Sequence, residues 1–600
     1  MEMKRDSSFL TKEYVKNLLP VMLSVLGGTV NALIDSLFVS RVLGPDALSA
    51  VNMTMPVYLV LCCIGALFAG GAGVTAARLI GLDEVKQAAL ACHRAVRLCL
   101  AAGFAILVIS IFAVRPLSEL LGHGGIYSGM ILPYIRVLLL FAPAFITLYI
   151  PTFFLQLDGK AVHISVMSAI IVVSDILLDY LLMCTAGLGL TGAALASGLS
   201  TLLATAYGLA LLGKRPSVFR LRGDGTGEES ADEDRGVGRT MAMYGKSLVS
   251  VSRIGSPIAL GSLYDAFRLL ILNSLILRTG GSAAMAVWAV LNMLFELSLM
   301  ITSGVPQAGA PMLGIFAGAR ENSGIRMLVR LETICGIIMS AVFGTVILAL
   351  SGPARTFYKL GTDMFLPLLC TALTVFFQLI VSVWTTQFNY SKFLWLAHLL
   401  VFFRRFLFPV LFAMLLLPHP GIYRWIFLPV SAAMIPAVCL VIVSAVRRKT
   451  KGTEHELSPV LLLDDYLERG HKVLDFSIRA DADEICSASA RISGFCEENE
   501  MGIRASNRIA LSIEELLTVI SDRNAQAAHM DIRVFALPEE TGIRVRCGGM
   551  QYDPFSDRES SEDYLMGISM LRNMAQTIIY TYALGWNNLM ISFERGNNKG

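Results

Sequence analysis

The sequence is poor in charge, and it lacks the short motifs that mark many soluble enzymes. Only 16% of its 600 residues are Asp, Glu, Lys or Arg, whereas 55% are hydrophobic and the mean hydropathy is +0.64. Soluble globular proteins carry ~25% charged residues. The net charge of +3 is also too small for the basic surface of a nucleic-acid-binding protein, so no nucleic acid partner is expected. The composition is instead typical of a polytopic membrane protein.

Metal and nucleotide motifs are missing as well. The 8 histidines include no His-x-x-x-His pair, and the 11 cysteines include no Cys-x-x-Cys pair. No Walker A sequence occurs either. We therefore predict no metal site, no cofactor and no enzyme motif in the membrane part of the chain. Any transport is expected to be driven by an ion gradient or to have no energy source.

The chain contains 12 apolar runs of about membrane-spanning length, which is roughly 20 residues. They predict an all-α membrane part of 12 helices, with one six-helix bundle in residues 1–213, a linker over 214–247 and a second six-helix bundle in 248–448. Lys and Arg gather in alternate loops, which are expected to be cytoplasmic. We therefore predict a multi-pass protein of the cell membrane with both termini cytoplasmic. The predicted spans lie near residues 17–39, 52–78, 91–113, 130–155, 162–184, 190–212, 250–275, 284–315, 328–350, 364–386, 394–416 and 423–446.

The two halves of the membrane part repeat one order of polar residues. Asp35 and Asp265 lie in the first span of each half, and Asn52 and Asn292 open the second span. Many transporters are built from such repeats. Tracts of small residues follow in both halves, but these alone indicate only close helix packing. The paired polar residues are what favours a repeat.

Acidic residues inside the spans are the strongest functional signal. A charged side chain in a span costs at least ~2.5–3.5 kcal/mol, so its presence points to a function. Asp175 and Asp179 are four residues apart and share one helix face, where two like charges favour exchange of a proton or binding of sodium. Together with Asp35 they are our predicted ion-coupling residues. The alternative is that Asp35, near Arg41, and Asp179, beside Tyr180, lie only at the membrane interface.

Other polar residues in the spans are candidates for lining a cavity, although each alone is as well explained by a hydrogen bond between packed helices. Arg268 lies three residues after Asp265, and this spacing allows it to neutralise the acid. The candidates are Asn52, Gln156, Asp265, Asn273, Asn292, Glu296 and Gln307.

Beyond residue 448 the composition becomes that of a soluble domain. We expect a linker over residues 449–474 and a cytoplasmic α/β sandwich over 475–596. Alternating apolar residues predict strands, and apolar residues at helical spacing predict helices. The expected order is a strand, two helices, a hairpin, a helix and a last strand, over residues 475–480, 483–499, 503–522, 531–537, 542–547, about 564–580 and 588–594.

A family resemblance rests on several motifs of the membrane part. Asp35 is followed by Phe38-Val39-Ser40-Arg41, by Ala47–Asn52 and by Pro56, and Leu178-Asp179-Tyr180 lies in the fifth span. This order, with Asn273-Ser274-Leu275-Ile276-Leu277 in the second half, resembles multidrug and toxic compound extrusion (MATE) transporters over residues 10–446.

The resemblance implies two six-helix bundles with a V-shaped cavity between them, and export coupled to protons or sodium. Asp35 falls on the acid of the family's first helix, and Asp179 on the second residue of its Asn-x-x-x-Asp pattern, where Asp175 replaces the Asn. This departure leaves the coupling ion open. Flippases for lipid-linked oligosaccharides share the fold class.

In the tail, Ile513–Leu517, Gly549–Phe555 and Gly567–Leu571 resemble the ATP-binding fold of anti-sigma kinases and histidine kinases, the GHKL type. That fold uses an Asn for magnesium, an Asp for the adenine amine and a glycine for phosphate. The matching positions hold Val519, Cys547 and Ser569. Valine cannot coordinate magnesium, and cysteine is a poor acceptor for an amine. We therefore predict a degenerate domain that does not bind ATP, with motif positions Glu515 (the place of the general base), Val519, Cys547, Gly549, Gly567 and Ser569.

Together these features predict a secondary active transporter. It would export amphipathic drugs or metabolites in exchange for H⁺ or Na⁺ by alternating access, and its tail would be regulatory and not an enzyme. Its partners would be a small-molecule substrate, the lipid bilayer and a cytoplasmic protein that binds the tail. Two alternatives stay open: a flippase for lipid-linked precursors, and a membrane sensor whose tail is an active protein kinase.

Overall fold

The structure is a computed structural model that describes most of the chain. The predicted linkers 214–247 and 449–474 lie largely outside the described residues, as do residues 557–564, which precede Gly567. The described residues are 8–122, 126–214, 217–219, 237–349, 365–391, 393–418, 426–450, 463, 472–499, 501–524, 529–537, 540–556 and 565–594.

The first bundle is helical throughout its described part. Its longest helices, α1 (Ser8–Leu43) and α4 (Val85–Leu121), have 36 and 37 residues. Each is about 55 Å long, which exceeds the ~30 Å hydrocarbon core of a bilayer. One end of each helix therefore has to extend beyond the membrane. The other elements are α2 (Pro45–Gly65), the π-helix η1 (Ala66–Gly70), α3 (Gly71–Gly81), α5 (Ile126–Leu140), α6 (Ala142–Thr147), α7 (Tyr149–Leu157), α8 (Val162–Asp179), the π-helix η2 (Tyr180–Thr185) and α9 (Gly189–Leu212).

The second bundle begins with α11 (Val237–Leu297). Gly281 interrupts this helix with a φ of 66°, a backbone conformation that glycine adopts without strain, and so divides it into two helices. The other elements are α12 (Leu299–Thr302), α13 (Gly304–Gly318), α14 (Asn322–Ala349), α16 (Phe365–Asn389), α17 (Leu394–Phe402), the π-helix η3 (Phe403–Leu407), α18 (Phe408–Leu416), α20 (Leu428–Ala432) and α21 (Met434–Thr450).

Eleven of the predicted spans coincide with apolar helices of the structure. Among the described residues, 10 helices are long and apolar enough to cross a membrane, and a pair bent by 52°, Tyr127–Leu140 with Ala142–Leu157, makes up to 11. The twelfth prediction is not confirmed, because in the described part of residues 423–446 the apolar helix is a shorter one, Leu428–Val443. Pro429 and Pro436 lie in this run, and proline lacks the N–H that a continuous helix needs.

Residues 472–594, here called the C-terminal domain, contain a five-stranded antiparallel sheet in the order β1-β2-β3-β5-β4. Our prediction of a helix to about residue 580 is wrong: the helix ends at Met574, and a further strand follows. Residues 577–583 are rich in Thr, Ile and Tyr, which favour strands. The elements are β1 (Val473–Arg479), α23 (Ala482–Glu498), α24 (Ile503–Arg523), β2 (His529–Ala536), β3 (Glu540–Gly548), α25 (Leu565–Met574), β4 (Thr577–Ala583) and β5 (Trp586–Glu594).

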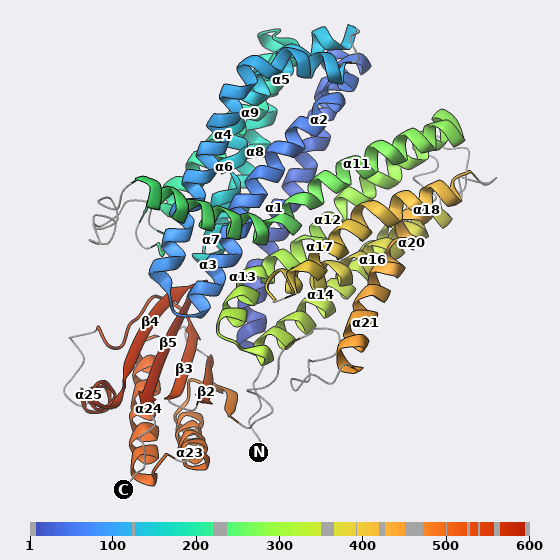
Figure 1. The fold of residues 1–600 in the computed structure, drawn as a ribbon. Helices are drawn as coiled ribbons and strands as arrows, with labels where there is room; N and C mark the ends of the chain where they lie inside the picture. The colour runs from blue at the N-terminus through green and yellow to red at the C-terminus, as the bar shows by residue number, and fades with distance from the viewer. Residues whose placement is uncertain are drawn as a thin grey trace.

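The sheet has two different faces because side chains alternate along each strand. In β3, Ile543, Val545 and Cys547 are at most 2% exposed and belong to the core that the sheet shares with its helices. Arg544 and Arg546 point to the other face. Figure 1 shows that this face lies against the ends of the two bundles, which are close together beside the domain and diverge away from it.

Candidate functional site

Three carboxylates of the first bundle lie together. Asp35 is on α1, and Asp175 and Asp179 are one turn apart on α8. Each contributes a carboxylate oxygen, and these oxygens all lie within 4.8 Å of one another. Asp175 and Asp179 are each 1% exposed, while Asp35 is half-buried. The structure therefore brings the three predicted ion-coupling residues into one cluster, here called the acid cluster.

Close packing of α1 against α8 positions the acid cluster. A Cβ at Gly27 would lie 2.2 Å from the Ser168 hydroxyl oxygen and 3.3 Å from the Ser168 Cβ, so glycine allows α8 to approach α1 closely at this point. The same Ser168 hydroxyl donates a hydrogen bond of 3.1 Å to the carbonyl oxygen of Ser24, which ties the two helices together. About two turns further along α1, Asp35 then meets the face of α8 that carries the other two acids.

Neutral side chains donate hydrogen bonds to two of the acids. Asn31 Nδ2 donates to Asp175 Oδ2 at 2.7 Å, and the Ser200 hydroxyl donates to Asp175 Oδ1 at 3.3 Å. The Ser197 hydroxyl donates to Asp35 Oδ2 at 3.4 Å. These donors fix the positions of the carboxylates, but they bring no positive charge to balance them.

Asp179 has a carboxylate oxygen without a hydrogen-bond partner. Its Oδ1 atom is buried and has no hydrogen-bond partner. Within the described residues the acid cluster forms no salt bridge, whereas Asp265 of the second bundle pairs with two arginines. Like charges this close in a poor dielectric cannot all stay ionised. An all-oxygen set of this kind suits protons or a hard cation such as Na⁺.

Sequence reasoning missed the groups that surround the acids. Tyr134 of α5 lies within electrostatic range of all three acids. Asn31 precedes Asp35 by one helical turn, and this spacing was a usable signal. Ser197 and Ser200 lie in a small-residue tract of α9 and carry no signal that distinguishes them from packing residues.

Asp265 of the second bundle is neutralised by arginines. Asp265 forms a salt bridge with Arg405, and a second one of 3.5 Å with Arg268, as the spacing in the sequence predicts. Glu296 is half-buried and lies in the electrostatic field of the same three groups. The structure therefore does not bring Asp265 or Glu296 to the acid cluster.

The remaining cavity candidates lie on different helices and differ in their exposure. Asn52 on α2 is exposed, and Gln307 on α13 is half-buried. Gln156 on α7 is 3% exposed, and its Nε2 atom has no hydrogen-bond partner. Asn273 accepts a hydrogen bond of 2.7 Å from a tryptophan indole of α11, and the buried Oδ1 of Asn292 has no partner. The amide of Asn273 thus has a packing role.

One buried acid of the second bundle was missed altogether. Glu332 of α14 is 0% exposed, and neither of its carboxylate oxygens has a hydrogen-bond partner. It faces Gly309 of α13, where a Cβ would lie 1.8 Å from Glu332 Oε1. Its place within a predicted span, four residues after the span begins, was a usable signal.

Cys547, one of the predicted nucleotide-motif positions, lines a small pocket of the C-terminal domain with Asn524, Tyr552, Tyr580 and Asn587. Burial raises the pKa of the Cys547 thiol to about 12. Asn587 Oδ1 accepts hydrogen bonds from the Tyr580 hydroxyl at 2.6 Å and the Tyr552 backbone N–H at 2.9 Å. The polar groups of the pocket are thus satisfied within the protein.

The other motif positions are dispersed. Val519 is 2% exposed within the core, and Glu515 has a buried Oε2 atom without a hydrogen-bond partner. Gly549 has a φ of +117°, and Ser569 is exposed on α25. Of Gly567 only the helical backbone of α25 is described.

Comparison with known proteins gives matches in both sequence and fold. Residues 20–181 match the family model MatE. The multidrug export protein MepA of Staphylococcus saprophyticus is 24% identical over 299 residues, which are 49% of this chain and 62% of that protein. MepA of Staphylococcus aureus is 24% identical over 334 residues, 54% of this chain and 69% of that protein.

Solved structures match the membrane part more widely. An outward-facing multidrug resistance MATE family transporter of the MOP superfamily has a TM-score of 0.66, with 19% identity, and covers 74% of this chain and 97% of its own. A MATE in complex with MaL6 has a TM-score of 0.65, with 20% identity, and covers 74% and 98%. The chain has the fold of a MATE transporter.

The MATE fold accounts for about three quarters of the chain. The chain is a multi-pass membrane protein with about 10 apolar helices among its described residues. This chain spans 62% of the length of the MepA from Staphylococcus saprophyticus.

Proposed function

We propose that this chain is a secondary active transporter that exports amphipathic compounds in exchange for H⁺ or Na⁺. The observation that carries the proposal is the acid cluster, which has three carboxylates and no salt bridge among the described residues of a MATE fold. The similar MepA proteins are multidrug exporters, which supports drugs or metabolites as the substrate class.

The acid cluster explains how an ion can drive the cycle. With three carboxylates close together in a poor dielectric, the empty site is repulsive, and binding of a proton or sodium ion relieves the repulsion. Asp179 Oδ1 offers the position without a partner, while Asn31 and Ser200 hold Asp175 in place. Because Asp35 is on α1 and the other acids are on α8, an ion bound between them pulls the two helices together. Release of the ion allows them to separate, and this alternation can be coupled to the movement of substrate.

The topology is part of the proposal. The short apolar helix Leu428–Val443 would be the twelfth span. By the distribution of Lys and Arg in the loops, the end of the bundles at which the C-terminal domain lies would be cytoplasmic. In this orientation the bundles are closed to the cytoplasm and diverge toward the outside.

The coupling role can be tested with the purified full chain in liposomes, by following export of a cationic dye under an imposed proton or sodium gradient. We expect Asp35→Asn and Asp179→Asn each to abolish gradient-driven export, because the site loses a charge that the ion has to neutralise. Asp46→Asn is the matched control, since Asp46 is an exposed acid at the start of α2. Unchanged export by both cluster variants would refute the role of the acid cluster.

We propose that the tail is a GHKL-like domain without catalytic activity. Val519 has no oxygen to offer magnesium, the Cys547 thiol is a poor acceptor for the adenine amine, and both side chains are only 2% exposed. The full chain in detergent should therefore show no magnesium-dependent ATP hydrolysis above that of a sample denatured by heat. Hydrolysis that Glu515→Gln abolishes would contradict this.

A further inference from the structure

Two arginines of one strand join the C-terminal domain to both bundles. On β3, the Arg544 guanidinium forms a 2.5 Å salt bridge with Asp83 of the first bundle. Two residues further along the strand, Arg546 forms a 2.5 Å salt bridge with Glu321 of the second bundle. The four side chains are between 1% and 8% exposed, so both pairs are closed off from water.

The two acids belong to equivalent turns of the repeated halves. Gly81-Leu82-Asp83-Glu84 ends α3 and leads into α4, and Gly318-Ala319-Arg320-Glu321 ends α13 and leads into α14. The third residue of each turn has a positive φ, 63° at Asp83 and 53° at Arg320. In each turn the N–H of the fourth residue donates to the carbonyl oxygen five residues before it. The domain therefore contacts the same kind of turn once in each bundle, through the third residue of the first turn and the fourth residue of the second.

The helices that lead into these turns touch through glycine. A Cβ at Gly81 would lie 2.1 Å from the carbonyl oxygen of Ile315, and a Cβ at Gly318 would lie 2.1 Å from the carbonyl oxygen of Arg78. This reciprocal approach brings the backbones of α3 and α13 together. The contact is where the bundles would have to part if the chain opened toward the C-terminal domain.

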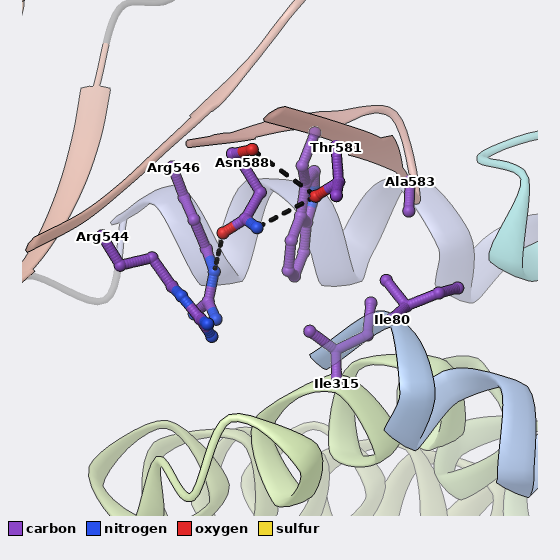
Figure 2. Close-up of a pocket in the computed structure, with 8 residues that line it drawn as sticks. Ile80, Ile315, Arg544, Arg546, Thr581, Ala583 and Asn588 are labelled. Carbon is purple, nitrogen blue, oxygen red and sulfur yellow. Dashed lines mark hydrogen bonds between the residues drawn. The ribbon is translucent and has the colours of Figure 1, made fainter. Parts of the chain in front are cut away.

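Further contacts fill the space around the ion pairs. Trp586 of β5 is 2% exposed, and its ring centroid lies 5.4 Å from that of Phe9 on α1 and 6.2 Å from that of Phe316 on α13. The Asn588 amide donates to Asp83 Oδ1 at 3.0 Å and accepts from Arg546 Nε at 3.2 Å, and so links the two pairs. Figure 2 shows the sheet residues on one side of this interface, with Ile80 and Ile315 of the two bundles on the other.

We propose that the C-terminal domain is a clamp that holds the α3 and α13 ends of the two bundles together, through Arg544 on Asp83 and Arg546 on Glu321, and that this end can open only when the domain releases one of the bundles. The inference rests on the proposed transport cycle, which requires the bundles to part on the cytoplasmic side. It goes beyond that cycle because it assigns the domain a regulatory role within the chain.

The geometry of the strand explains why the hold is rigid. Residues two apart on a strand are separated by about 6.6 Å and point to the same face. Since both arginines belong to the central strand of a hydrogen-bonded sheet, the distance between the two anchored turns cannot change while both pairs persist. Separation of α3 from α13 therefore breaks at least one buried pair.

Distance measurements on the full chain can test the clamp. Spin labels at Gln87→Cys on α4 and Arg330→Cys on α14 report the separation of the bundles near the two turns, because both sites are exposed. The background replaces the exposed cysteines with serine. We expect R544E together with R546E to increase the population of long distances severalfold. The same double reversal at the exposed Arg504 and Arg508 of α24 should leave the distances unchanged.

A charge swap separates release from misfolding. Adding D83R and E321R to the double variant restores opposite charges at both pairs, and we expect it to restore the short distances. Detachment of the C-terminal domain is measured by acrylamide quenching of Trp586 fluorescence. The signal of Trp586 is obtained by subtracting that of a Trp586→Phe control. The clamp is overturned if the domain stays attached in the double variant, if it detaches without a change in the distances, or if the swap restores nothing. Failure of the proposed function would appear separately, as absence of dye transport in the unmodified chain.

Discussion

The buried carboxylates at the clamp and in the acid cluster differ in their partners. Asp83 and Glu321 face arginines at the clamp, while Asp175 and Asp179 of the acid cluster receive only neutral donors or none. An arginine beside a buried carboxylate stabilises its charge, whereas clustered carboxylates without a basic partner repel one another, and binding of a proton or sodium ion relieves that repulsion. The first setting suits a structural contact, and the second suits ion coupling.

Gly81 provides a test of the contact between α3 and α13. In Gly81→Ala the new methyl group would lie 2.1 Å from the carbonyl oxygen of Ile315, which is backbone and cannot rotate away. We expect a loss of about 1–3 kcal/mol in stability, typical of overpacking, seen as a lower melting temperature in detergent. Gly28→Ala on α1 is the matched control, because nothing lies within 4 Å of its Cβ position. Equal melting temperatures for the two variants would argue against close contact at this point.

Docking of the C-terminal domain should depend on pH through Asp83. Burial raises the pKa of the Asp83 carboxyl, although Arg544 and Arg546 oppose the shift. The docked form therefore takes up a proton more readily than the released form, so docking should strengthen as the pH falls through the raised pKa and weaken as it rises through it. Burial lowers the pKa of Arg544 to about 10, so this group changes docking only at much higher pH.

Acrylamide quenching of Trp586 between neutral and mildly acidic pH measures this dependence. Quenching should decrease as the pH falls, since docking covers the ring. Asp83→Asn lacks the titrating group but keeps the acid cluster, so its profile should be flatter. If the two profiles have the same slope, another group is responsible.

The sequence predicted the acids of the cluster but not their surroundings. Asp35 was predicted because it is a charged residue inside a span, and helix geometry predicts that Asp175 and Asp179, four residues apart, share one face. Which donors reach these acids depends on how α1 and α9 lie against α8, and hence on contacts such as that of Gly27 with Ser168. Such packing involves residues far apart in the sequence, and no local pattern specifies it.

At the scale of elements, apolar length predicted most of the membrane helices and failed at short or mixed segments. The eleven runs that match the structure are long and little interrupted, so length alone identifies them. Residues 564–580 failed because a helix and a strand follow one another there, with only Ala575 and Gln576 between them. The alternation of apolar residues predicted β3 as a strand. Its two arginines were the only sign that the face of the sheet away from its helices is covered by the bundles.

Strand β3 also allows the coupling across the interface to be measured. Arg546→Met leaves the Glu321 carboxylate buried without its partner, and the loss of one member of a buried pair costs about 3–5 kcal/mol. We expect docking to weaken and quenching of Trp586 to increase. Glu321→Gln combined with Arg546→Met removes both charges and should recover much of the docking. Arg504→Met on the exposed α24 is the control, and an equal effect of this change would exclude a specific pair.

At the scale of the whole molecule, one helix connects the two sites. Phe9 at the start of α1 packs on Trp586 at the clamp, and Asp35 near its end belongs to the acid cluster. The 26 residues between them correspond to about 39 Å of helix. The clamp and the acid cluster are thus at opposite ends of the first bundle, too far apart for direct interaction, but they share an element whose movement both can restrain.

This separation predicts that release of the clamp and ion coupling can be removed independently. Arg544→Glu with Arg546→Glu should increase the long-distance population between residues 87 and 330 and keep gradient-driven dye export. Addition of Asp35→Asn should leave the long distances in place but abolish export, because effects of distant sites without shared partners add. Distance measurement and dye export on the same preparations check this. If Asp35→Asn instead restored the short distances, the two sites would be coupled through α1, and the acid cluster would control the clamp as well as the ion.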